Sequence, residues 1–348
     1  MRRVEDSIRA VRKGPMLSCA LLPGELTVCA VFDRSIYVRS AGGDIICLCG
    51  EELPMGPFTL MCESWPLPVS AQSGDMWILT DGAIALSQTT RIVLDTVVAW
   101  EPPRIPIWNA TTCERALAKL REAGERCFPV RDGLAVLLPE ALGMTRLRIH
   151  EVDGFYPLHC GGDEARETPP LPEIGDKIGG FAVQNLAKAG REGLRALDEW
   201  LCTPPGQVFP TARQRMPENL LGLGPGLTPS GDDVLGGVLL ALHRLGFAKR
   251  ASLLGERLLG VARERTNQIS YAYLRAATAG YGSSVLHSAV AAVCADSPAL
   301  YETLQGLNSL GHSSGWDAFL GIVCVCRRVR LLMEQQLSGR RRYTLPPP

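Results

Sequence analysis

The residue pattern best suited to chemistry is the glycine-rich run from Gly222 to Asp233, which precedes an amphipathic stretch. Its alternating glycines, among them Gly224 and Gly226, permit positive φ angles and a close approach of the backbone to a ligand. A helix that begins at the end of this run presents unpaired N–H groups suited to an anion, and Thr228 and Ser230 supply hydroxyl donors. The run therefore predicts a phosphate or carboxylate cradle.

Two consecutive aspartates, Asp232 and Asp233, complicate this prediction. They stand where a Walker loop requires lysine followed by serine or threonine, so the run is not a Walker loop. Negative charge at a helix start stabilises the helix but repels an anion from the same N–H groups. A divalent cation such as Mg²⁺ would resolve this conflict; alternatively, one aspartate hydrogen-bonds neighbouring loops or an amide substrate. A third interpretation is a plain glycine-rich turn in which Ser230 caps the helix.

A second polar run, Gly311 to Asp317, has the same organisation, with small and hydroxyl residues leading into an apolar helix. Ser313 or Ser314 can cap that helix, and Asp317 falls in its first turn. His312 can donate to an anion or relay a proton. Because the side chains of adjacent His312 and Ser313 point apart, a Ser-His-Asp triad gains no support. The alternative is a capped helix with a solvated surface histidine.

A third polar helix start lies between the other two, at Thr266 to Ser270. Asn267 and Ser270 are three residues apart, so their polar groups can line one face of a helix. An isolated polar face of this kind is usually solvated. Three polar helix starts in one helical region instead predict a shared mouth, where several N-termini converge on an anionic substrate.

The rest of the chain supplies two kinds of element that must position these runs. From about Met16 to Ala99, short alternating runs separated by turn residues are typical of a β-rich unit. A short helix is expected at Ala116 to Leu120 and a further strand at Leu134 to Leu138. The strands expected in the β-rich unit cover residues 26–32, 36–39, 45–48, 76–79 and 92–98.

Beyond a proline-rich connection at Gly161 to Lys177, the apolar period becomes helical, which predicts an α+β fold. The expected helices cover residues 235–245, 250–264, 268–279, 284–295 and 316–333. The sequence thus predicts a β-rich N-terminal domain over residues 1–165 and a mostly helical C-terminal domain over residues 178–335. Residues 336–348 are expected to form a flexible tail.

Composition excludes several classes of partner. Lys plus Arg and Asp plus Glu both number 36, whereas nucleic-acid-binding proteins usually carry a basic excess, so no nucleic acid is expected. The 12 cysteines include no C-x-x-C pair, so we expect reduced thiols in a cytoplasmic protein. No apolar run approaches the roughly 20 residues that span a bilayer, so no membrane partner is expected. Zero net charge is compatible with a homo-oligomer or a larger assembly.

The three polar runs, in this order, resemble the signature blocks of a bacterial family formerly described as a domain of unknown function. That family includes one subunit of the oxamate carbamoyltransferase of allantoin catabolism. The resemblance covers most of residues 15–335 and is strongest in the C-terminal half. It implies carbamoyl transfer between oxamate and oxalurate, with carbamoyl phosphate and phosphate as the other pair, in an assembly with partner subunits. The motifs of aspartate-type and ornithine-type carbamoyltransferases are absent.

Carbamoyl transfer needs an anion cradle, donors that polarise the carbamoyl oxygen and an aligned amide nucleophile. The candidate catalytic residues are Asp232, Asp233, His312 and Asp317. The candidate substrate-binding residues are Gly224, Gly226, Thr228, Ser230, Asn267, Ser270, Ser313 and Ser314. No cofactor is assigned beyond the Mg²⁺ that the aspartates could hold, and no metal ligand is specified.

Two other hypotheses compete with this one. The first is a non-catalytic subunit whose loops bind a small anion or a partner in a larger enzyme complex. The second is a kinase-like phosphotransferase, which the missing cradle lysine disfavours. Convergence of the polar side chains in one pocket would indicate a functional site, because purely structural caps would be scattered over the surface.

Overall fold

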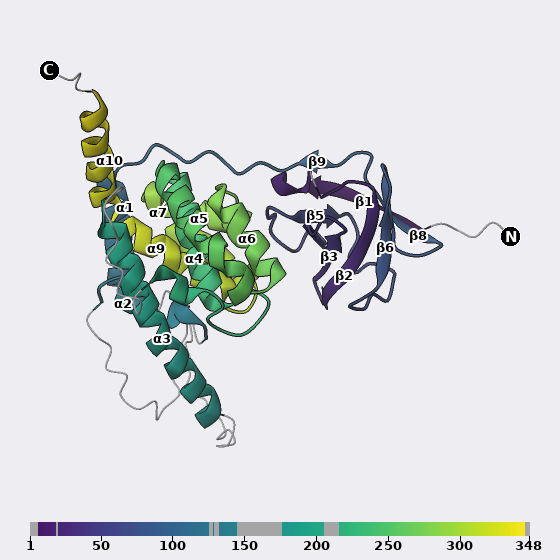
Figure 1. Cartoon of the computed structure of the whole chain (residues 1–348), viewed down its shortest axis with the longest axis horizontal. Helices are drawn as coiled ribbons and strands as arrows, with labels where there is room; N and C mark the ends of the chain where they lie inside the picture. The colour runs from purple at the N-terminus through teal and green to yellow at the C-terminus, as the bar shows by residue number, and fades with distance from the viewer. Residues whose placement is uncertain are drawn as a thin grey trace, which may run out of the picture.

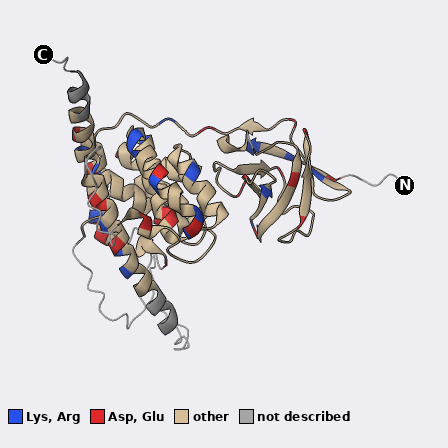
Figure 2. Cartoon of the chain, in the orientation of Figure 1, with Lys and Arg blue, Asp and Glu red and all other residues tan. Residues whose placement is uncertain are grey.

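The protein has two parts, a β-barrel followed by a group of helices, as the sequence predicts. A computed structural model describes residues 6–18, 20–124, 128, 132–144, 176–204 and 216–344. The barrel spans residues 6–99 and the helices follow, so the α+β class and the order of its two halves are confirmed. The segment from Trp100 to Asn109 joins the two parts along one edge (Figure 1). Figure 2 shows charged residues of both signs in both parts.

Eight strands of the described residues close the barrel, and a ninth extends it. Hydrogen bonding follows the order β5-β4-β3-β2-β6-β7-β8-β1, β1 pairs with β5 to close the ring, and β9 pairs with β1. The β1–β8 and β4–β5 pairs are parallel and the other pairs of the ring are antiparallel. The strands are β1 (Asp6–Lys13), β2 (Gly24–Phe32), β3 (Ser35–Ser40), β4 (Ile45–Cys49), β5 (Thr59–Cys62), β6 (Met76–Leu79), β7 (Ala83–Ala85), β8 (Thr90–Val93) and β9 (Val98–Ala99).

Aliphatic and aromatic side chains fill the barrel interior, and they alternate with outward-facing residues along the strands. In β6, Trp77 and Leu79 are buried whereas Met76 and Ile78 are exposed. β4 and β5 are buried along their whole length. These two strands lose their polar face because their outer side contributes to a cleft against the helical part.

Helices of very different length make up the second part of the chain. They are α1 (Ala110–Ala123), α2 (Leu138–Ala141), α3 (Asp176–Cys202), α4 (Ser230–Arg244), α5 (Ala248–Arg265), α6 (Gln268–Thr278), α7 (Ser284–Cys294), α8 (Leu300–Gln305), α9 (Ser314–Arg327) and α10 (Val329–Thr344). Short 3₁₀ turns η3 (Leu134–Leu137), η4 (Pro217–Leu220) and η5 (Gly306–Ser309) lie between them. α1, η3 and α2 share one apolar core with the later helices.

Helices α4 and α9 cross closely enough that glycine is required on both. A Cβ atom on Gly237 of α4 would lie 1.9 Å from the backbone oxygen of Ala318, and one on Gly321 of α9 would lie 2.0 Å from that of Val234. Both helices are nearly all buried on the sides that meet. Since each helix begins directly after a polar run, this crossing brings Gly222–Asp233 and Gly311–Asp317 together in space.

Helix α6 connects the helical part to the barrel. Ile269, Ala272 and Ala276 on one side of α6 belong to the apolar cluster of the barrel. The ring of Tyr273 meets that of Phe58 edge to face, with centroids 5.4 Å apart. In Figure 1, α6 is the labelled helix that lies nearest the barrel. The Thr266–Ser270 run at the start of α6 is therefore placed between the two parts of the molecule.

The structure differs from the sequence predictions at several elements. The strand expected at Leu134–Leu138 is wrong: these residues form η3 and the start of α2, packed in the helical core. A short apolar run is compatible with either a buried strand or a buried helical turn, and no strand of the described residues lies beside it. The expected 92–98 strand is interrupted, giving β8 and β9, and the 316–333 helix divides at Arg328 into α9 and α10.

Of the five strands expected in the β-rich unit, those at 26–32, 36–39, 45–48 and 76–79 are confirmed as β2, β3, β4 and β6. β1, β5 and β7 were not predicted. Residues 161–175 of the expected proline-rich connection lie outside the described residues. The domain boundary expected between residues 165 and 178 therefore stays a prediction. Helix α10 extends to Thr344, through most of the segment expected to be a flexible tail.

Candidate functional site

A cleft of about 1300 Å³ lies between the barrel and the starts of α4, α6 and α9. We call it the central cleft. Its helical wall contains residues of all three polar runs, and its barrel wall comes from the β2–β3 hairpin and from β4 and β5. The convergence expected of a functional site is therefore present. The residues of the polar runs that line it are Gly224, Pro225, Gly226, Leu227, Thr228, Ser230, Asp232, Asp233, Ile269, Ser270, Gly311, His312, Ser313 and Ser314.

The glycine-rich loop folds tightly over the start of α4. Gly222 has a φ of 72°, and a Cβ atom there would lie 2.0 Å from the backbone oxygen of Arg265. Gly224 has a φ of 114°, and a Cβ atom there would lie 2.9 Å from the backbone nitrogen of Ser230. Glycine is thus required at both positions by conformation and by space. The loop backbone is held against the helix start, where it faces the cleft.

Asp232 joins the glycine-rich loop to the start of α6. Its Oδ1 accepts a hydrogen bond from the backbone N–H of Gly222 at 2.8 Å. Its Oδ2 accepts one from Ser270 Oγ at 2.6 Å and another from the hydroxyl of Thr266. With only 2% of the residue exposed, Asp232 has both oxygens engaged within the protein. Among the interpretations that the sequence leaves open, this geometry matches hydrogen bonding to neighbouring loops.

Asn267 also joins the glycine-rich loop to the start of α6. Its Oδ1 accepts hydrogen bonds from the backbone N–H groups of Ile269 and Ser270, both at 3.0 Å, and so caps α6. Its Nδ2 donates to the backbone oxygen of Leu227 at 2.7 Å. Asn267 and Ser270, predicted to bind substrate, thus have their polar groups occupied by loop and helix contacts.

Asp317 lies behind the cleft wall and is fully buried. Its Oδ1 accepts a hydrogen bond from the backbone N–H of Ala135 at 2.7 Å, which holds η3 against α9. Burial raises the pKa of Asp317 to about 6, and hydrogen bonds from the hydroxyls of Ser313 and Ser230 oppose that shift. Its Oδ2 is buried without a hydrogen-bond partner among the described residues. The Asp317 carboxyl therefore takes up a proton closer to neutrality than an ordinary aspartate.

Asp233 lies beside Asp317 and faces the cleft. Burial raises the pKa of the Asp233 carboxyl well above its usual range, and the charge of Asp317 raises it further. Hydrogen bonds from the hydroxyls of Ser314 and Thr228 act in the opposite sense. Those two hydroxyls lie 2.9 Å apart and link the Gly222–Asp233 run to the Gly311–Asp317 run. The Oδ2 of Asp233 is buried and has no hydrogen-bond partner among the described residues.

The adjacent aspartates of α4 therefore differ in what they can do. Both oxygens of Asp232 are occupied by donors, whereas Asp233 is buried beside a second carboxyl, which favours its protonated form. A protonated carboxyl with a free oxygen can donate a hydrogen bond to an anion or exchange a proton with a ligand. The geometry thus makes Asp233, and not Asp232, the aspartate suited to proton transfer.

His312 stands at the mouth of the central cleft. Its Nε2 lies 2.8 Å from Oδ2 of Asp132, and 86% of its side chain is exposed. Asp132 also lines the cleft, although the sequence analysis did not single it out. An exposed imidazole paired with a carboxylate can reach a ligand that enters the cleft, but it lies apart from the buried pair of Asp233 and Asp317.

The barrel wall adds residues that the sequence analysis did not assign. Arg34, at the exposed tip of the β2–β3 hairpin, is the one Lys or Arg side chain among the described residues that line the cleft. Deeper in the cleft, Tyr37 hydrogen-bonds to Tyr273 of α6 and to Cys47 of β4. A charged turn between two strong strands is the signal that could have identified Arg34.

Neither a metal centre nor a membrane span is found in the described part of the chain. No group of three or more His, Cys, Asp and Glu residues within it is arranged to hold a metal ion. No helix within the described ranges is both long enough and apolar enough to cross a bilayer.

Comparison with known proteins finds a family match over the segment that contains the three polar runs. The family model described as oxamate carbamoyltransferase subunit AllH matches residues 220–326, from the 3₁₀ turn before the glycine-rich loop to the end region of α9. The resemblance seen in the sequence is thereby confirmed over the segment that builds the helical wall of the cleft.

The comparisons with individual proteins support fewer conclusions than the family match does. A curated relative described as cyclic AMP-responsive element-binding protein 3-like protein 2, from Xenopus laevis, is 27% identical over 186 residues. These residues make up 51% of this chain and 35% of that protein, so the match spans about a third of the relative's length. No solved structure matches the chain significantly.

Proposed function

We propose that the chain, whose residues 220–326 match the family of oxamate carbamoyltransferase subunit AllH, is a subunit of such an enzyme and that its central cleft holds the reacting molecules. One observation carries this proposal. Hydroxyl groups of the Gly222–Asp233 and Gly311–Asp317 runs meet around the carboxyl of Asp233, at the starts of two helices and at the wall of the cleft. Carbamoyl transfer needs such a combination of anion donors and a proton-exchanging group.

The proposed reaction joins the amide nitrogen of oxamate to the carbamoyl carbon of carbamoyl phosphate. The new C–N bond forms as the C–O bond to phosphate breaks, so phosphate leaves, the amide loses one proton and oxalurate is produced. The reverse direction uses the same groups. Because the oxamate amide is a very weak acid, alignment of the two substrates contributes more than proton abstraction by itself.

The cleft residues divide into two proposed groups of roles. The loop backbone at Gly224 and Gly226, with the hydroxyls of Thr228, Ser230, Ser313 and Ser314, holds the phosphate or carboxylate oxygens. Asp233, protonated when the substrates bind, gives its proton to the departing phosphate oxygen and then accepts the amide proton. Burial, together with the charge of Asp317 behind it, keeps the pKa of Asp233 raised. His312 and Arg34 at the mouth contact the anionic end of the substrate. Asp232, Asn267 and Ser270 position the loop through the hydrogen bonds that they make to it.

Acidic residues at the cleft impose a condition on this mechanism. Asp232 and Asp233 both lie at the helix start that would bind the anion, and like charge repels it. The protonated form of Asp233 removes one of these charges and supplies a donor in its place. Substrate binding is therefore tied to the protonation of Asp233, and we expect the affinity for carbamoyl phosphate to fall when that proton is lost.

The experiment that tests the proposal combines binding with turnover. Calorimetric titration of the purified chain with carbamoyl phosphate, phosphate, oxamate and oxalurate is expected to show saturable binding of at least one anion. Asp233→Asn keeps a donor and the neutral charge, so binding should persist while transfer by the assembled enzyme falls about 100-fold or more. Arg327→Gln, at an exposed arginine at the end of α9, is the matched control and should change neither quantity.

A non-catalytic role in the same complex is the second candidate. It is favoured by one observation: Asp232, Asn267 and Ser270, which are polar residues of these runs, are all occupied by internal hydrogen bonds. In that case Asp233→Asn would leave transfer by the assembled enzyme unchanged. Loss of ligand binding with intact transfer would likewise place the reaction in a partner subunit.

A further inference from the structure

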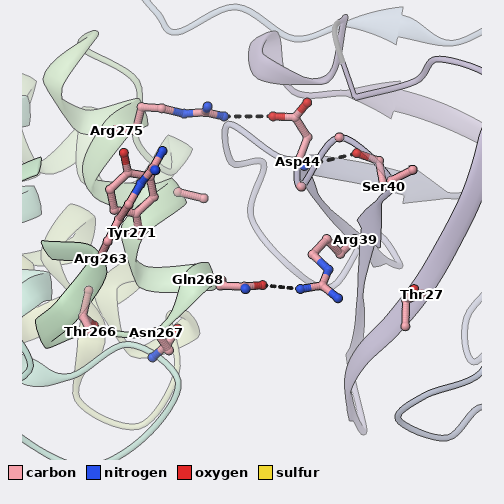
Figure 3. Close-up of a pocket in the computed structure, with 14 residues that line it drawn as sticks. Thr27, Arg39, Ser40, Asp44, Arg263, Thr266, Asn267, Gln268, Tyr271 and Arg275 are labelled. Atoms are coloured by element: carbon pink, nitrogen blue, oxygen red, sulfur yellow. Dashed lines mark hydrogen bonds and ion pairs between the residues drawn. The ribbon is translucent and has the colours of Figure 1, made fainter.

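A second cleft, separate from the central cleft, lies between the β3–β4 hairpin and helices α5 and α6 (Figure 3). Its volume is about 560 Å³, and none of its lining residues lines the central cleft. Thr266, Asn267 and Gln268 form part of its wall, so the turn before α6 separates the two clefts. We call it the arginine cleft, after Arg39, Arg263 and Arg275.

The three arginines enter the arginine cleft from both parts of the molecule. Arg39 comes from β3 of the barrel, Arg263 from the end of α5 and Arg275 from α6. Figure 3 shows Arg39 directed toward Gln268 and Arg275 directed toward Asp44. An anion bound among them would therefore bridge the barrel hairpin and the helices.

Only one of these guanidinium groups meets a carboxylate of the described residues. Arg275 Nη2 lies 3.0 Å from Asp44 Oδ1. Arg39 Nη1 donates to the neutral amide oxygen of Gln268 at 2.6 Å. Arg263 lies over the ring of Tyr271, 5.2 Å from its centroid, and makes no ion pair with the described residues. The lining residues thus carry three positive charges and one negative charge, a surplus of two.

We propose that the arginine cleft binds a small dianion with phosphate-type or carboxylate-type oxygens. Guanidinium groups present paired N–H donors that match such oxygens, and they bind them more tightly than neutral donors do. The surplus charge of two equals that of a doubly ionised phosphate or a dicarboxylate. A volume of about 560 Å³ is within the range of small-molecule sites. This site is independent of the proposed carbamoyl transfer, because it shares no lining residue with the central cleft.

Arg263 offers the sharpest test, because among the described residues it packs over the face of Tyr271 without an ion pair, so its loss should leave the fold intact. Calorimetric titration of the full chain with pyrophosphate, inorganic phosphate and malonate, at constant ionic strength, measures the dissociation constants. Arg263→Gln is expected to weaken the tightest of these by about tenfold, and Arg39→Gln should act in the same direction. The preference between phosphate-type probes and malonate identifies which oxygens the site takes.

Two controls locate the binding. Arg327→Gln removes an exposed arginine far along α9 and should leave the affinity unchanged. Thr228→Val alters the central cleft without touching the arginine cleft, and it should likewise leave the affinity of this site unchanged. Equal weakening by Arg263→Gln and Arg327→Gln would show non-specific charge attraction and overturn the proposal. So would weakening by Thr228→Val alone, or no saturable binding of any of the three probes to the wild-type chain.

Discussion

The central cleft and the arginine cleft lie on opposite sides of the same turn, yet they carry opposite charges. Thr266 and Asn267 line the arginine cleft, whereas Ile269 and Ser270 line the central cleft. The central cleft has one arginine and four aspartates among its lining residues, and the arginine cleft has three arginines and one aspartate. The glycine-rich motif that predicts an anion cradle thus lies in the acidic cleft.

This difference shows that a motif and its electrostatic surroundings are separate properties. Helix starts and glycine turns supply N–H donors wherever they occur, but the charge of a cleft depends on every side chain that faces it. In the central cleft, the proposed anion binding depends on the proton of Asp233. In the arginine cleft, fixed charges contributed by β3, α5 and α6 attract an anion at any ordinary pH.

The largest expected effect concerns the helix crossing that builds the central cleft. In Gly237→Ala, the new Cβ meets the backbone of Ala318, so α4 and α9 must move apart. We expect the free energy of unfolding to fall by about 3 kcal/mol, measured by urea denaturation followed by circular dichroism. Gly236→Ala is the matched control on the same helix, because its Cβ meets nothing within 4 Å. It should stabilise the protein by up to about 1 kcal/mol. Similar results for both variants would contradict the tight crossing.

The next effect separates the two adjacent aspartates of the central cleft. Asp232→Ala leaves the N–H of Gly222 and the hydroxyl of Ser270 without their acceptor in a buried site. The expected loss is about 2 to 3 kcal/mol of unfolding free energy. Asp233→Asn should change stability by less than about 0.5 kcal/mol at neutral pH, because it removes a carboxyl whose charged form burial already disfavours. Greater destabilisation by Asp233→Asn would reverse the roles assigned here.

A pH titration sharpens the contrast with the fixed charges of the arginine cleft. Because burial raises the pKa of Asp317 from an ordinary value of 3.8 to about 6, the folded state holds this proton more tightly than the unfolded chain. The resulting stabilisation is complete below the unfolded pKa and is lost as the pH rises through the folded pKa. Between pH 4 and pH 6, the unfolding free energy of the wild type should therefore fall by about 2 to 3 kcal/mol more than that of Asp317→Asn. Parallel curves for the two proteins would contradict a raised pKa at this position.

The smallest effect concerns the acid of the arginine cleft. Asp44→Asn removes the carboxylate that pairs with Arg275 at the partly exposed edge of that cleft. Stability should change by less than about 0.5 kcal/mol, as is usual for an exposed ion pair. Pyrophosphate affinity, measured by calorimetry, should rise about threefold because one repulsive charge is lost. A decrease in affinity would mean that Asp44 positions Arg275 for the ligand instead of competing with it.

Several elements of the fold could be predicted because their pattern is local. β2, β3, β4 and β6 alternate or are continuously apolar between turn residues, and the helices α4, α5, α6, α7 and α9 have clear apolar periods. η3 could not be distinguished from a strand, because Leu134–Leu138 is too short to show a period. β1 was missed since its place depends on parallel pairing with β8, which lies far along the chain.

The candidate site was predicted in part for the same reason. The glycines, hydroxyls and acids of the three runs are readable in order, and the structure gathers them in one cleft. The roles of individual residues could not be predicted from the sequence. Asp232 and Asp233 are neighbours of identical type, and only their contacts distinguish them. Arg34 and Asp132 enter the cleft from segments that carry no motif.

By itself, the sequence determined the α+β class, the three polar helix starts and the resemblance to a carbamoyltransferase subunit family, because propensity, periodicity and motif are properties of neighbouring residues. Only the tertiary structure decided which aspartate is saturated with donors and which is enclosed beside a second carboxyl. It also decided that Arg39, Arg263 and Arg275 share one cleft. Burial and charge at a site sum over all the segments that surround it, and those segments become neighbours only when the chain folds.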